Sequence, residues 1–63
     1  MDWKLIREAV TKYRHQFAPE YNLVVKYGAR SPLIATRARL YERLTSALEE
    51  IEKEIQKERE NAN

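Results

Sequence analysis

Apolar residues recur along the chain at helical spacing, in two stretches separated by a short break. The first set follows Asp2, a suitable N-cap, at steps of three and four: Trp3, Ile6, Val10, Tyr13 and Phe17. The second set falls at steps of three, four and seven: Ile34, Tyr41, Leu44, Leu48, Ile51 and Ile55. We call these sets the first and second seams. Each seam lies on one face of an α-helix, and the pattern predicts an all-α protein.

Local signals indicate where these helices begin and end. Ser31 and Pro32 open the second helix, because serine caps free amides and proline suits the first turn. Pro19 interrupts the first stretch, since a proline inside a helix costs about 3 kcal/mol. Gly28 suits the residue after a helix, where a left-handed conformation is needed. We therefore expect a first arm kinked or broken at Pro19 and a long second helix over residues 31–60.

Residues 20–27 allow two interpretations. Their valines and tyrosines are common in strands, which favours an extended segment. Tyr21 and Val24, however, continue the first seam at steps of four and three from Phe17. A lone strand would need a partner strand from another copy of the chain. We therefore predict a second helical piece that ends near Tyr27.

The two seams match as the arms of an antiparallel helical hairpin. If the chain folds back between Gly28 and Ser31, the apolar residues of the two arms lie level with one another. The level pairs are Trp3 with Ile55, Ile6 with Ile51, Val10 with Leu48, Tyr13 with Leu44, Phe17 with Tyr41, and Val24 with Ile34. We expect one small helical domain over residues 1–63, with a C-terminal tail, residues 61–63, that frays.

A second apolar stripe runs beside the seams and is a candidate for self-association. It comprises Leu5, Ala9 and Leu23 on the first arm, and Leu33, Leu40 and Ala47 on the second. A chain this short buries only about 60% of its unfolded surface, and it has no cysteine for disulfides. Two hairpins paired through the stripe would form a four-helix bundle, so we expect a homodimer. The alternative is that the stripe merely flanks the seams, as apolar residues do on most helices.

The net charge of +2 is unevenly distributed. Residues 1–47 carry nine lysines and arginines against four acids, a net charge of +5. Residues 48–63 carry three against six, a net charge of −3. No apolar run approaches the roughly 18 residues of a membrane span, and the N-terminus lacks the features of a signal peptide. We expect a cytoplasmic protein without membrane contact.

Candidate catalytic and metal-ligating residues are few. His15 is the sole histidine, and no nucleophile or orienting carboxylate accompanies it in sequence. A run of glutamates spreads around one helix and does not converge on a cation: Glu49, Glu50, Glu52 and Glu54. Gly28 is the only glycine, whereas a phosphate-binding loop normally needs several. We expect no enzyme activity, no metal and no cofactor.

The strongest functional candidates are basic residues near the predicted turn: Arg14, Lys26, Arg30, Arg37, Arg39 and Arg43. Tyr13, Tyr27 and Tyr41 are interleaved with them, although the first and last also occupy seam positions. Such a surface can be merely solvated, can dock a protein, or can bind nucleic acid. We predict a small non-enzymatic regulator or adaptor that binds a larger protein. The alternative is a basic DNA- or RNA-binding protein that acts as a dimer.

Overall fold

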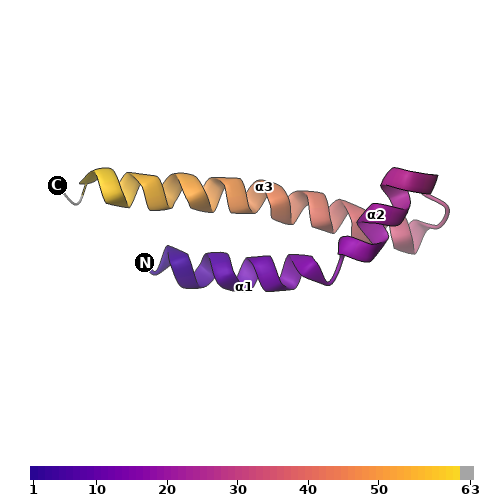
Figure 1. Cartoon of the computed structure of the whole chain (residues 1–63), viewed down its shortest axis with the longest axis horizontal. Helices are drawn as coiled ribbons and strands as arrows, with labels where there is room; N and C mark the ends of the chain where they lie inside the picture. The colour runs from indigo at the N-terminus through magenta and orange to yellow at the C-terminus, as the bar shows by residue number, and fades with distance from the viewer. Residues whose placement is uncertain (62–63) are drawn as a thin grey trace.

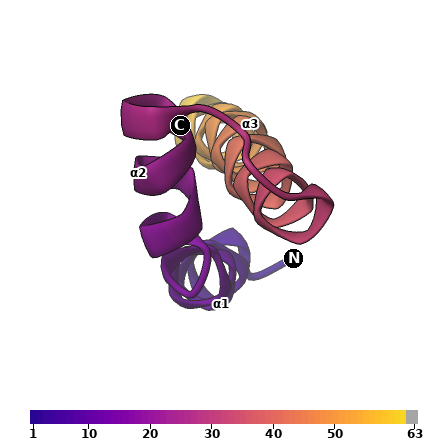
Figure 2. The same ribbon diagram turned by 90° about the vertical axis from the view of Figure 1, so that its right-hand side faces the viewer.

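The chain is entirely helical in its regular secondary structure, over the residues 1–61 that the computed structural model describes. Helix α1 spans Trp3–His15, α2 spans Ala18–Tyr27 and α3 spans Pro32–Asn61. Both shorter helices pack against α3, and α2 turns away from the line of α1 (Figures 1 and 2). The molecule measures 50 × 15 × 15 Å. The all-α prediction is confirmed. Asn61 of the predicted tail ends α3, and residues 62–63 lie outside the described residues.

The junction between α1 and α2 lies at Gln16 and Phe17, ahead of the expected position at Pro19. Pro19 occupies the second position of α2. If α1 continued through it, the proline ring would collide with the carbonyl of His15, four residues earlier. The last turn of α1 instead tightens, and the Phe17 amide donates to the Arg14 carbonyl at 2.9 Å. The chain therefore breaks before the proline, which then starts a new helix.

Residues 20–27 are helical, so the extended interpretation of this segment is wrong. Helix α2 ends at Tyr27, and the Gly28 amide donates to the Val24 carbonyl at 2.8 Å. Gly28 has φ 84° and ψ 170°, a positive φ as expected but outside the left-handed helical region. Gly28 is therefore the C-cap of α2, whereas the sequence predicted that it would be the residue that follows the C-cap.

Gly28→Ala is expected to lower the free energy of unfolding by about 1–3 kcal/mol, because positive φ with extended ψ is essentially restricted to glycine. An added Cβ would have no atom within 4 Å, so the cost comes from the backbone and not from a collision. Urea unfolding followed by circular dichroism measures the change. Ala29→Ser in the same exposed turn is the control, with an expected change below about 0.5 kcal/mol. An unchanged midpoint for Gly28→Ala would contradict the argument.

Capping side chains start α1 and α3 as the sequence indicates. Asp2 Oδ1 accepts a hydrogen bond from the Leu5 amide at 3.3 Å. Ser31 Oγ accepts one from the Ile34 amide at 3.2 Å, and Pro32 is the first residue of α3. Each cap satisfies an amide that lacks an intrahelical partner. No helix within residues 1–61 has both the length and the apolar character to cross a membrane.

The core is a thin line of side chains between α3 and the other two helices. Its buried members are Phe17, Ala38, Ile51 and Ile55. No side chain of residues 1–61 is less than 2% exposed. Tyr13, predicted as a seam residue, is 49% exposed and meets Phe17 only edge to face. Tyr41, expected to lie level with Phe17, stacks on Tyr21 of α2 at a centroid distance of 4.5 Å.

Candidate functional site

Two of the six predicted basic residues hold the helices together. Arg14 of α1 donates from Nη1 to Thr45 Oγ1 of α3 at 3.0 Å, and its guanidinium lies 5.0 Å from the Tyr41 ring centroid. Arg37 of α3 donates from Nε to Glu20 Oε1 of α2 at 2.8 Å. The Arg37 guanidinium also lies 4.9 Å from the Phe17 ring centroid. These contacts are structural, and they remove Arg14 and Arg37 from the candidate surface.

Arg37→Ala is expected to destabilise the protein by about 1–3 kcal/mol, through loss of a charged hydrogen bond and a cation–π contact. The Glu20 carboxylate is half-buried, and its Oε2 has no hydrogen-bond partner within residues 1–61. Without Arg37 both carboxylate oxygens would lack a partner. Thermal unfolding gives the change. Arg30→Ala, in the exposed turn, controls for loss of a positive charge and should leave the midpoint nearly unchanged.

Arg30 lines an apolar hollow at the turn, which we call the turn hollow. It is lined by Leu23, Tyr27, Gly28, Arg30 and Ile34, and its volume is about 110 Å³. Leu23 and Tyr27 are 45% and 55% exposed. The Lys26 ammonium lies 5.4 Å from the Tyr27 ring centroid, so that cation stands beside the aromatic wall. This end of the molecule therefore presents exposed apolar groups together with two positive charges.

Arg39 and Arg43 lie elsewhere, on the side of α3 that faces away from α1. Both line a shallow hollow with Thr36 and Leu40, and a second one with Glu42 and Ser46. Neither takes part in an ion pair within residues 1–61. The six basic residues thus separate into a structural pair, a turn pair and an outer pair, and the structure does not gather them into one surface.

The second apolar stripe is uneven in exposure. Leu5 and Leu33 are 62% and 69% exposed, and Ala9 is exposed too. Leu40 and Ala47 are half-buried. Leu23 belongs to the turn hollow and not to this stripe. What remains of the stripe lies along α1 and α3.

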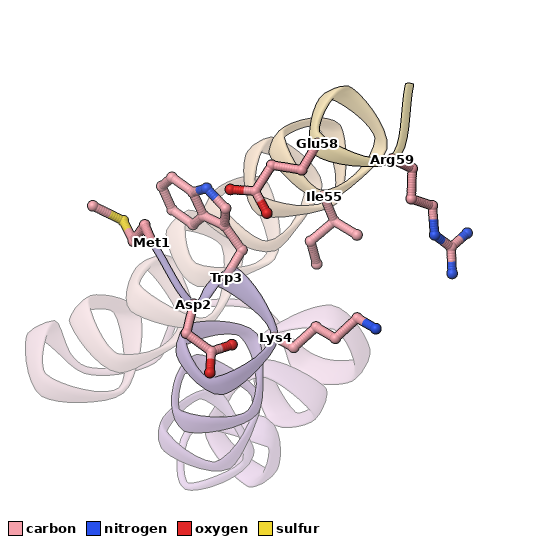
Figure 3. Close-up of a pocket in the computed structure, with 7 residues that line it drawn as sticks. All are labelled: Met1, Asp2, Trp3, Lys4, Ile55, Glu58 and Arg59. Atoms are coloured by element: carbon pink, nitrogen blue, oxygen red, sulfur yellow. The ribbon is translucent and has the colours of Figure 1, made fainter. Parts of the chain in front are cut away.

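A second hollow, which sequence reasoning missed, lies at the opposite end of the molecule. Met1, Asp2, Trp3, Lys4, Ile55, Glu58 and Arg59 line it, and its volume is about 270 Å³ (Figure 3). The Trp3 ring and Glu58 carboxylate lie on one side of Ile55, with Lys4 and Arg59 on the other. The predicted pairing of Trp3 with Ile55 could have indicated this hollow. It is the last apolar pair of the two seams, so no further pair covers the side that faces the end of the molecule. The lining of the hollow contains acidic and basic side chains, and the hollow is open to solvent.

Other candidate chemistry is not concentrated at one point. His15 is exposed at the end of α1. Within residues 1–61, no group of three or more histidines and acids is placed to hold a metal ion. No protein-family model, curated protein or solved structure gives a significant match to this chain.

Proposed function

We propose that this chain is a small non-enzymatic regulator or adaptor that binds a larger protein through the turn hollow. The observation that supports this function is an apolar recess at the tip of a highly charged molecule, with Arg30 in its lining and Lys26 against the Tyr27 ring. Protein interfaces concentrate binding energy where an anchoring side chain fills a desolvated pocket inside a polar rim. The turn hollow offers both parts of such a contact.

The size of the turn hollow limits what can enter it. An engineered apolar cavity of about 150 Å³ accommodates benzene. A hollow of about 110 Å³ therefore has room for one aliphatic side chain of a partner. Tyr27 supplies a flat wall for that side chain, and tyrosine is enriched among residues that dominate binding energy. We infer a partner segment with a single leucine-sized anchor.

The charge around the turn hollow indicates the character of the rest of that segment. The first 47 residues have a net charge of +5, Arg30 lines the hollow, and the Lys26 ammonium lies beside Tyr27. Rim charges steer association with an oppositely charged partner and suppress wrong ones. The partner segment is therefore acidic on both sides of its anchor. Binding of this kind weakens with added salt but keeps its apolar contribution.

We further propose that two copies of this helical hairpin associate into a four-helix bundle. The thin core supports this, because a domain of this size buries only enough apolar surface for a narrow margin of stability. The exposed Leu5 and Leu33 beside half-buried Leu40 and Ala47 provide the surface for association. Self-association involves a different surface from the turn hollow, so the two proposals can fail separately.

Charge reversal at the turn tests the docking proposal. Arg30→Glu and Tyr27→Ala should each remove the same captured proteins in a pull-down from native extract read by mass spectrometry. Lys4→Glu changes the charge equally at the far end and should retain them; a glutamate in the first turn also suits the helix dipole. Proteins lost with both turn variants and retained by Lys4→Glu are the partners. Identical capture by all four proteins would contradict a docking role for the turn hollow.

The same proteins distinguish docking from nucleic-acid binding. A nucleic-acid complex must weaken steeply with salt, because binding releases counterions from the phosphates. Gel shifts with duplex DNA and with RNA, repeated at several salt concentrations, give that slope. The docking proposal predicts no shift that depends on Arg30. A salt-sensitive shift lost in Arg30→Glu would support the nucleic-acid function instead.

A further inference from the structure

We propose that the second copy packs antiparallel along the outer face of α3, about a two-fold axis near Ala47, with Arg43 of each copy beside Glu50 of the other. This arrangement rests on the self-association proposed above and specifies its geometry. It assigns a role to Arg43 of the outer pair, which the turn hollow does not use.

One side of the contact between α1 and α3 is closed by polar bridges. Arg7 forms an ion pair with Glu52, and Arg14 donates a hydrogen bond to Thr45. Successive residues of an α-helix are rotated by about 100°. That rotation places Leu5 and Ala9 of α1, and Leu40 and Ala47 of α3, on the opposite side. This side carries the apolar stripe, and it is where a neighbour can bury apolar surface.

The outer face of α3 changes sign at its middle. Residues at helical spacing along this face are Thr36, Leu40, Arg43, Ala47, Glu50 and Glu54. A parallel neighbour would place Arg43 against Arg43 and Glu50 against Glu50, which is repulsive. An antiparallel neighbour centred on Ala47 places Arg43 against Glu50 twice, once on each side of the axis. The charge pattern therefore selects the antiparallel arrangement.

The sizes and levels of the side chains suit the same arrangement. Ala47 is small, so two copies of α3 can approach closely at the axis. The Arg7–Glu52 bridge sets α1 against α3 so that Leu5 lies level with Glu54. The two-fold axis then brings Leu5 of one copy level with Leu40 of the other. Leu5 of each copy thus meets an apolar partner, and the four helices enclose one core.

Light scattering coupled to gel filtration tests this geometry on the full chain. The wild type is expected at twice the chain mass of 7.5 kDa at about 100 µM. Arg43→Glu alone and Glu50→Arg alone should each weaken dimerisation by about tenfold or more, since each creates two like-charge contacts per dimer. The two changes in one chain recreate the opposite-charge contacts and should restore the wild-type dissociation constant to within about threefold.

Controls separate the arrangement from the dimer itself. Lys4→Glu makes the same charge change on α1, away from the proposed contacts between Arg43 and Glu50, and should leave dimerisation unaltered. The Glu50–Lys53 ion pair is lost in Glu50→Arg and in the double variant, so its loss cancels when these two proteins are compared. A monomeric wild type overturns the self-association proposal. A dimeric wild type whose single variants bind normally, or whose double variant is no better than either single one, overturns this antiparallel arrangement alone. Far-ultraviolet circular dichroism confirms that each variant stays helical.

Discussion

Phe17→Ala is expected to leave most of the chain unfolded at 37 °C, since truncating a buried phenylalanine costs about 3–5 kcal/mol. Phe17 is 5% exposed and sits at the junction of α1 and α2. Its ring meets the edge of Tyr13 at 5.2 Å and lies under the Arg37 guanidinium. A domain this small has stability near the low end of the usual range, about 5 kcal/mol. The Phe17→Ala substitution alone therefore removes most of the free energy of unfolding.

Urea unfolding followed by helical ellipticity measures the Phe17→Ala effect. All variants are compared at one protein concentration, because a dimer makes apparent stability depend on concentration. Gln16→Ala, at the exposed neighbouring position, is the control and should change the unfolding free energy by less than about 0.5 kcal/mol. A Phe17→Ala protein with a wild-type midpoint would show that this junction does not depend on its ring.

Ile51→Ala is expected to cost about 2–5 kcal/mol, the range for removing a buried isoleucine side chain. Ile51 is 7% exposed and lies where α3 covers α1. Leu48, one turn earlier, is half-buried, so Leu48→Ala should cost less than Ile51→Ala. The ranking of these two neighbouring sites tests the depth of the core directly.

Val25→Ala is the matched control for Ile51→Ala. Val25 is 67% exposed on α2, and alanine has the better helix propensity. Its unfolding free energy should stay within about 0.5 kcal/mol of wild type. Hydrogen exchange adds a second measurement, since loss of Ile51 should accelerate exchange along both α1 and α3. If Val25→Ala destabilised the chain as much as Ile51→Ala, the core would have to include the outer face of α2.

The sequence identified the basic residues of the candidate site but could not sort them. Arg37 meets Glu20, which lies 17 positions away and beyond the helix break. Arg14 meets Thr45, which is 31 positions away. The periodicity of a helix shows the direction in which a side chain points from that helix. It does not show which residue of another helix the side chain contacts. The turn hollow could not be predicted from the sequence for the same reason, because it forms only when Leu23 of α2 and Ile34 of α3 line the same space.

The sequence by itself determined the helical fold and most of the helix ends, because those signals are local. A capping oxygen at Asp2 or Ser31, and a glycine at position 28, act within a few residues of where they stand. The tertiary structure decided which apolar residues are covered. Matching the two seams assumes that one helical phase continues from Trp3 to Tyr27, and the break at Gln16 and Phe17 resets that phase. Tyr21, beyond the break, stacks on Tyr41, whereas Tyr13 of α1 remains half exposed.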